Sequence, residues 1–159
     1  MYGKCGQLNG FDQLCYVAES EENKPKAVSD ESFEVLKRYC SDTLEEYDYT
    51  KELCCSDEQI PDLITQLQMP EGLIARCPSC FYNFRKVFCE FTCSPYQRYF
   101  LNVTEENRED SNGNNPPHKQ MVTVVDYFIS QRFVDAAFDS CKDVVFSPTN
   151  GYAMDTLCG

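Results

Sequence analysis

The sequence predicts an α+β domain that is stapled by disulfides, with helices first and a small β-sheet late in the chain. Apolar residues recur at helical spacing in several segments between residues 29 and 141. The clearest strand pattern follows most of them, near residues 121–128. Eleven cysteines among 159 residues are typical of an oxidised protein outside the cytosol. This length suits one domain with a packed core.

The first segment is expected to be irregular, because glycine and polar residues dominate positions 1–28. Cys5 and Cys15 are near enough in the chain to close a small ring within it. Ser29 is expected to cap a first helix, since two acidic residues follow it in the first turn. The apolar stripe of that helix consists of Phe33, Leu36, Tyr39 and Cys40.

A second helix is predicted to start at Ser56. The run Ser56-Asp57-Glu58-Gln59 matches a capping box, in which Gln59 serves the first turn. Apolar residues then lie at i, i+3, i+4 and i+7, which is the pattern of an amphipathic helix. They are Ile60, Leu63, Ile64 and Leu67. Pro70 is expected to end this helix.

A third helix is predicted with Pro78 near its start, where the missing proline N–H costs little. Cys89 and Cys93 lie one turn apart on this helix or at its end. Glu105–Lys119 is expected to be an exposed loop, since Asn, Asp, Glu and Pro are frequent there. Just before it, Asn102 begins an Asn-Val-Thr sequon for N-glycosylation, which suits exposure in a lumen.

The last third of the chain carries the predicted sheet. Met121–Phe128 is rich in β-branched residues, and Val144–Phe146 is expected to form a second short strand. Between them, Ser130 is expected to cap a helix that includes Cys141. Tyr152–Cys158 is expected to form a final short helix.

The charge balance limits the partners. Twenty-six acidic and fourteen basic residues give a net charge of −12. Such a surface repels phosphate backbones and anionic headgroups, so neither nucleic acid nor a peripheral membrane contact is expected. No apolar run approaches the roughly 18 to 20 residues that span a bilayer. The first residues also lack a signal peptide, so we expect a removed signal or a segment of a longer precursor.

The Cys-Pro-Ser-Cys run at residues 77–80 has three interpretations. It could be a redox pair, although that motif normally follows a strand. It could bind zinc together with Cys89 and Cys93, which would leave seven cysteines unexplained. The favoured interpretation is that each cysteine joins a different neighbour. The single histidine, His118, lies in a polar segment, so we expect neither an enzyme nor a cofactor.

Three blocks of the sequence carry a family resemblance: Cys77–Asn83, Phe88–Pro95 and Phe100–Thr104. They are similar to the N-terminal lumenal domain of the Niemann-Pick type C sterol transporters, which are large membrane proteins. Three further segments follow in the family's order, namely Tyr2–Gly6, Cys54-Cys55 and Leu157–Gly159. The resemblance therefore covers the whole chain. The end segment Asn150–Asp155 is more similar to fungal members.

The resemblance implies the state of every cysteine. The implied disulfides are Cys5–Cys15, Cys40–Cys89, Cys55–Cys93 and Cys80–Cys141. In relatives, the position of Cys54 pairs with a cysteine upstream of Tyr2, and that of Cys77 with one downstream of Gly159. The position of Cys158 is unpaired. We therefore expect residues 1–159 to be a single domain that is cut at both ends from a larger membrane protein.

The resemblance also implies a sterol ligand, held in an apolar pocket among the helices with its hydroxyl end innermost. Gln59 matches the family's glutamine contact to the hydroxyl, and its capping role stays open beside this one. Leu14 stands where the family has a second polar contact. Leu63 and Phe88 match wall positions, although core packing alone would also explain them.

Two late positions and the partners complete the expectation. Leu157 matches a leucine near the pocket mouth, and Thr156 replaces its leucine neighbour. The family implies loading by a small soluble sterol carrier in the acidic lumen of a late endosome, lysosome or vacuole. The alternative is a cysteine-rich ectodomain of folate-receptor type that binds another ligand or a protein. The sequence contains no tryptophan for such a site.

Overall fold

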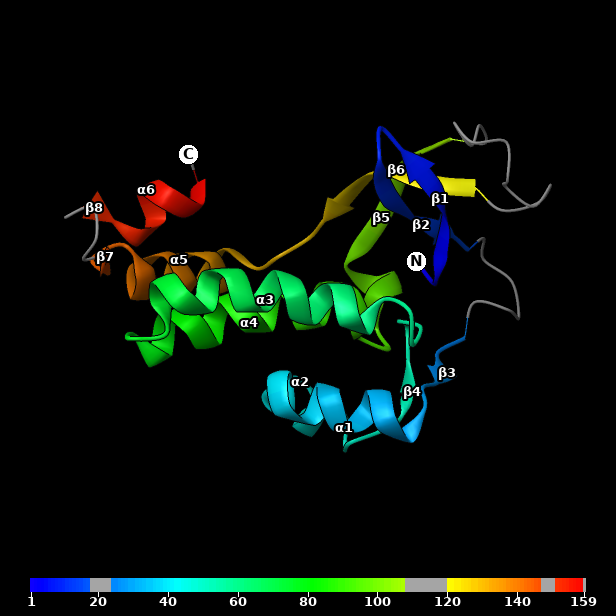
Figure 1. The fold of residues 1–159 in the computed structure, drawn as a ribbon, viewed down its shortest axis with the longest axis horizontal. Helices are drawn as coiled ribbons and strands as arrows, with labels where there is room; N and C mark the ends of the chain where they lie inside the picture. The colour runs from blue at the N-terminus through cyan, green and yellow to red at the C-terminus, as the bar shows by residue number, and fades with distance from the viewer. Residues whose placement is uncertain (18–23, 108–119, 147–150, 159) are drawn as a thin grey trace.

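A computed structural model describes residues 1–17, 24–107, 120–146 and 151–158, and it confirms a disulfide-stapled α+β fold. The helices are α1 (Asp30–Tyr39), α2 (Ser41–Glu45), α3 (Ile60–Ile74), α4 (Pro78–Cys93), α5 (Gln131–Cys141) and α6 (Ala153–Cys158), with a 3₁₀ turn at Gln97–Tyr99. The strands are β1 (Lys4–Leu8), β2 (Phe11–Tyr16), β3 (Lys26–Ala27), β4 (Glu52–Leu53), β5 (Leu101–Asn107), β6 (Gln120–Tyr127), β7 (Val145–Phe146) and β8 (Gly151–Tyr152). In Figure 1, α3 and α4 run along the middle, with the β1–β2–β6–β5 sheet at one end and α5 and α6 at the other.

The main sheet is antiparallel and has the order β1-β2-β6-β5, so it is not confined to the end of the chain. The prediction of an irregular N-terminal segment is wrong for the residues of β1 and β2. The two strands form a hairpin whose loop residues, Asn9 and Gly10, have φ values of 52° and 83°. An Asn-Gly pair favours such a two-residue turn, because both positions need positive φ. The hairpin then joins the late strands through the pair Cys15 and Met121.

The predicted helix starts at Ser29, Pro78 and Ser130 are confirmed. The Ser29 hydroxyl accepts a hydrogen bond from the Ser32 N–H at 3.2 Å, and Ser130 accepts one from the Phe133 N–H at 3.3 Å. Pro78 is the first residue of α4. Each of these starts depends on residues within one turn, so local sequence is enough to specify them.

The prediction that Pro70 ends the second helix is wrong. Pro70 lies inside α3, which continues to Ile74. Ile74 is fully buried in a small cluster with Cys80 and Cys141. Burial of a side chain of this size stabilises by roughly 1.5–3 kcal/mol, which offsets much of the roughly 3 kcal/mol cost of an interior proline. Tertiary packing thus extends the helix past the proline.

The late elements are strands and a helix where these were predicted, but one strand pairs outside the main sheet. The predicted strand at 121–128 is β6, and the predicted strand at 144–146 is β7. β7 pairs with β8 in a ladder of its own rather than with the main sheet. The predicted final helix is α6. The expected loop at 105–119 begins as the end of β5, and its residues 108–119 lie outside the described part of the chain.

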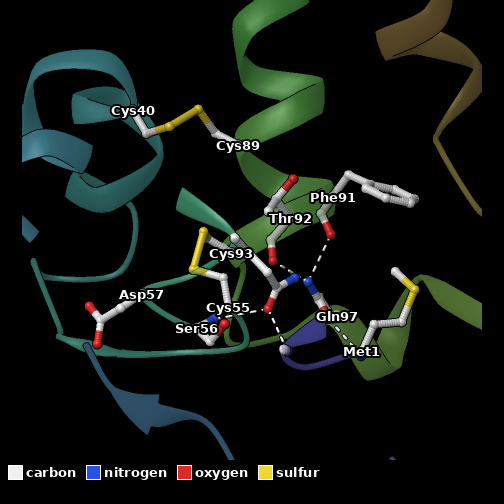
Figure 2. The surroundings of a disulfide bond; sticks show 12 residues. Met1, Cys40, Cys55, Ser56, Asp57, Cys89, Phe91, Thr92, Cys93 and Gln97 are labelled. Carbon is white, nitrogen blue, oxygen red and sulfur yellow. Dashed lines mark hydrogen bonds between the residues drawn. A yellow bond between two sulfur atoms is a disulfide. The ribbon is translucent and has the colours of Figure 1, made fainter. Parts of the chain in front are cut away.

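The four described disulfides join the pairs that the resemblance implies. Cys40–Cys89 and Cys55–Cys93 tie α4 to the segment around α1 and to the segment before α3, as Figure 2 shows. Cys80–Cys141 links α4 to α5, and Cys5–Cys15 crosses the β1–β2 hairpin. The main core lies between α1, α2, α3 and α4. None of the described helices has the length and apolar character needed to cross a membrane.

Candidate ligand-binding pocket

A pocket of about 460 Å³ opens between the β1–β2 hairpin, α3, α4 and β6. We call it the Gln59 pocket. Its volume falls in the range of roughly 300–1,000 Å³ that is usual for sites of small organic ligands. Apolar side chains from three elements form its walls. They are Leu14 from β2, Leu63 from α3, and Val87, Phe88 and Phe91 from α4.

Four predicted ligand contacts line this one pocket. They are Gln59, Leu14, Leu63 and Phe88, which come from the hairpin, α3 and α4. Leu63 and Phe88 also pack in or against the main core, as the core-packing alternative expects, and their contact with a sterol stays a prediction. The side chains of Thr156 and Leu157, although placed in α6, lie outside the described part of the structure.

Gln59 is the deep polar group of the pocket, with only 3% of its surface exposed. Its carbonyl oxygen Oε1 accepts a hydrogen bond from the Gly3 N–H at 2.7 Å and another from the Ser56 N–H at 2.9 Å. Gln59 therefore fills its half of the expected capping box. The other half is missing, because the buried Ser56 hydroxyl has no partner among the described residues. The regular helix accordingly begins at Ile60 and not at Ser56.

Thr92 and Tyr127 also line the pocket, and sequence analysis missed both. Thr92 lies one helical turn after Phe88, so the spacing of α4 could have indicated it. Tyr127 lies on β6, and no local pattern places it beside α4. Burial raises the pKa of Tyr127 to about 12, so its hydroxyl keeps its proton at neutral and acidic pH.

An ion-pair cluster forms the rim of the pocket. The Lys4 ammonium lies 3.0 Å from a carboxylate oxygen of Asp12 and 2.7 Å from one of Asp62. Lys4 belongs to β1, Asp12 to β2 and Asp62 to α3, so the cluster ties the hairpin to the helix. Hydrogen bonds to Asp62 and Asp12 raise the pKa of Lys4. Hydrogen bonds from Gln7 and Lys4 lower the pKa of Asp12.

A larger hollow of about 820 Å³ lies elsewhere, near Tyr96 and Arg98. Charged and hydroxyl-bearing side chains make up much of its lining, and it contains none of the predicted ligand contacts. We therefore place the candidate site in the smaller, more apolar Gln59 pocket. Asn102 borders the larger hollow from β5, where its exposed side chain leaves the sequon accessible. Its glycosylation remains a prediction.

The remaining cysteines do not assemble into a reactive pair. Cys80 is bonded to Cys141, so the Cys-Pro-Ser-Cys run is not a redox disulfide. Cys89 and Cys93 belong to two further disulfides and do not join Cys77 around a metal. Within the described ranges, Cys54 and Cys77 are unpaired, and no cluster of three His, Cys, Asp or Glu is placed to hold a metal ion. The side chain of Cys158 lies outside those ranges.

Comparison with known proteins identifies relatives along the whole chain. The family described as Niemann-Pick C1 N terminus matches residues 1–159. The NPC intracellular cholesterol transporter 1 of Sus scrofa is 35% identical over 160 residues, which cover 99% of this chain and 12% of that protein. Homolog 1 of that transporter from Caenorhabditis elegans is 41% identical over 98 residues, covering 59% of this chain and 7% of the relative. The NPC1-like intracellular cholesterol transporter 1 of Mus musculus is 28% identical over 162 residues, with coverages of 99% and 12%.

The matched region is therefore a small part of each relative, about an eighth of the two mammalian proteins. Within that part, the similarity to the pig protein runs from end to end of this chain. The full-length family match and the full-length relative agree. The chain belongs to the Niemann-Pick C1 N terminus family.

Proposed function

We propose that this domain binds a sterol in the Gln59 pocket and passes it on for export from the lumen of a late endosome, lysosome or vacuole. The sterol is carried without chemical conversion. The observation that carries this proposal is a largely apolar pocket that is lined by one buried amide, Gln59. The relatives, whose names describe cholesterol transporters, support the ligand class.

The apolar walls supply the affinity. A sterol that buries roughly 500 Å² of apolar surface gains at most about 12 kcal/mol at about 25 cal/mol per Å². Lost translational and rotational freedom cancels a good part of that gain. One hydrogen bond to Gln59 adds only about 1 kcal/mol, whereas a buried hydroxyl without a partner costs more. The amide therefore sets the orientation of the sterol more than its affinity.

Leu14 changes the chemistry of the hydroxyl end. An apolar side chain lines the pocket there, at the position where the family resemblance implies a polar contact. Gln59, with the Thr92 hydroxyl on the facing helix, is then left to meet the sterol oxygen. With one amide and one rotatable hydroxyl, this pocket restricts the hydrogen-bonding geometry of the ligand oxygen less than two fixed amides would.

The proposal includes two partners. A small soluble lumenal carrier delivers the sterol, and the remainder of a parent membrane transporter receives it. The relatives are about eight times longer than the matched segment, which supports a role for this domain within a larger protein.

Saturable binding of a radiolabelled sterol to the oxidised domain tests the proposal. Val87→Trp places a large side chain in the pocket and is expected to abolish binding. Tyr82→Trp is the matched control, since Tyr82 lies on the same helix, is exposed and does not line the pocket. Absence of saturable binding by the unsubstituted domain, or full binding by Val87→Trp, would contradict the proposal.

A further inference from the structure

The orientation of the Gln59 amide is fixed by two hydrogen bonds. Its Oε1 faces the N–H groups of Gly3 and Ser56, at 2.7 and 2.9 Å. A backbone N–H can only donate, so the group that faces both of them must be the carbonyl oxygen. A flipped amide would direct its NH₂ group at two donors and lose both hydrogen bonds. The nitrogen of Gln59 therefore points away from this pair.

That nitrogen has no acceptor in the described protein. No hydrogen bond joins it to any described residue, and the side chain that carries it is almost fully buried and lines the pocket. The nitrogen itself is not fully buried, since the Ser56 hydroxyl is the buried unpaired side-chain atom among the described residues. A ligand that covers the N–H₂ group without accepting a hydrogen bond from it would leave it unpaired, which is costly. Gln59, as a lining residue of the pocket, can thus offer a ligand a hydrogen-bond donor whose orientation is fixed.

The surroundings hold this donor in place. Gly3 presents its N–H from a backbone with φ of 74°, a conformation that favours glycine. The next residue, Lys4, is tied to α3 through Asp62, and Cys5 is bonded to Cys15. The Thr92 hydroxyl is the adaptable group, because it can rotate to donate or to accept.

We propose that the Gln59 pocket recognises the ligand oxygen as a hydrogen-bond acceptor and does not require it to donate. This inference rests on the proposed sterol site and extends its ligand class. Sterols with a ring-A ketone bind there as well as sterols with a ring-A hydroxyl. The same skeleton without oxygen binds more weakly, since it leaves the Gln59 N–H₂ group unpaired.

Competition against a radiolabelled hydroxysterol tests this inference with three ligands of one skeleton: the hydroxyl, the ketone and the hydrocarbon. We expect the ketone to compete within about threefold of the hydroxyl, and the hydrocarbon to be at least about fivefold weaker. A ketone as weak as the hydrocarbon would overturn the inference while the sterol site stands. Absence of binding by all three would overturn the proposed function and this inference with it.

Gln59→Glu exchanges a hydrogen-bond donor for an acceptor by changing a single atom of the side chain. The carboxylate keeps an oxygen for the Gly3 and Ser56 N–H groups, which stabilise its charged form, and it replaces the NH₂ donor with an acceptor. At pH 7 we expect this variant to retain the hydroxysterol, which can donate, and to weaken the ketone at least about tenfold. Gln68→Glu is the matched control, because it makes the same change on α3 at an exposed residue that does not line the pocket.

The two variants give clear outcomes. Unchanged ketone affinity in a folded Gln59→Glu protein would overturn the inference, as would an equal loss in Gln68→Glu. Circular dichroism and the unfolding midpoint check the fold of both. If Gln59→Glu does not fold, the three-ligand comparison on the unsubstituted domain decides the question.

Discussion

The helical half of the molecule and its N-terminal hairpin are held together in different ways. The helical half, α1 to α4, encloses a large apolar cluster that includes the fully buried Leu36 and Leu67. In the hairpin cluster, the buried residues are Cys5, Cys15 and Met121. The hairpin is therefore held by a disulfide, an ion-pair cluster, the pairing of β2 with β6 and one hydrogen bond from Gly3 to Gln59. The pocket lies where the densely packed half meets the lightly packed one.

This contrast explains how a pocket can persist in a stable domain. A dense core tolerates no void of this size without a large cost. A hairpin held mainly by directional links can stand away from the helices and leave space between them. The comparison predicts that substitutions that remove contacts in the helical half unfold the domain, whereas substitutions that remove contacts of the hairpin open the pocket.

The largest effect is expected from removing the disulfide inside the helical half. Cys40→Ala/Cys89→Ala frees a loop with a sequence separation of 49 residues. Loop entropy of this size corresponds to about 4 kcal/mol of unfolding free energy. Denaturant unfolding of the doubly substituted protein measures the loss. A smaller loss than that of the hairpin pair, Cys5→Ala/Cys15→Ala, would break the comparison.

A smaller and more local effect is expected from Cys5→Ala/Cys15→Ala. The separation of 10 residues limits the entropic loss to at most about 3 kcal/mol. We expect faster hydrogen exchange in β1 and β2, weaker sterol binding, and unchanged protection in α1 and α3. Hydrogen-exchange mass spectrometry distinguishes the regions. Uniform loss of protection across the domain would show that the hairpin is not a separate unit.

A still smaller effect is expected from Lys4→Gln, which removes the ion-pair cluster at the rim. Its partly exposed charges contribute little and are screened by salt. We expect a slightly lower unfolding midpoint at low salt, with the difference lost at high salt. Lys142→Gln breaks a comparable exposed pair with Asp139 on α5 and serves as the control. If Lys142→Gln also accelerated hydrogen exchange in β1 and β2, the effect of Lys4→Gln could not be attributed to the ion-pair cluster at the rim.

The pH dependence of this cluster follows from the lowered pKa of Asp12. A carboxyl group whose folded pKa is below its unfolded value contributes stability that is fully present above the unfolded value, about 3.9. The contribution is lost as the pH falls through the lowered pKa. The cluster should therefore remain intact at the pH of an acidic lumen. Thermal unfolding of the native protein and Lys4→Gln between pH 7 and pH 3 tests this.

The smallest effect is expected from Glu90→Gln in the helical half, with the opposite pH dependence. Burial raises the pKa of Glu90, whose carboxylate accepts a hydrogen bond from the Tyr47 hydroxyl. The charged form is thus disfavoured on folding above the raised pKa, and this cost is relieved as the pH falls through it. We expect a higher unfolding midpoint for Glu90→Gln at pH 7.5 and a smaller gain near pH 5. The exposed control Glu71→Gln should show no such gain.

Several parts of the fold were predictable because short-range interactions specify them. The helix starts at Ser29, Pro78 and Ser130 depend on a hydroxyl or a proline ring within one turn. The hairpin had a local signal as well, in Asn9-Gly10, which sequence analysis did not use. The continuation of α3 through Pro70 had none, because it depends on packing of Ile74 against Cys80 and Cys141.

The sequence by itself determined the oxidised cysteine framework, the family and the identity of the deep polar residue. Only the tertiary structure decided what that residue does. Gln59 lies 56 positions from Gly3, and no local pattern could place the two side by side. Because Gly3 and Ser56 both donate to its oxygen, the Gln59 amide is fixed with its nitrogen directed away from these two groups. The fixed orientation of this amide, in a residue that lines the pocket, is therefore a property of the folded chain.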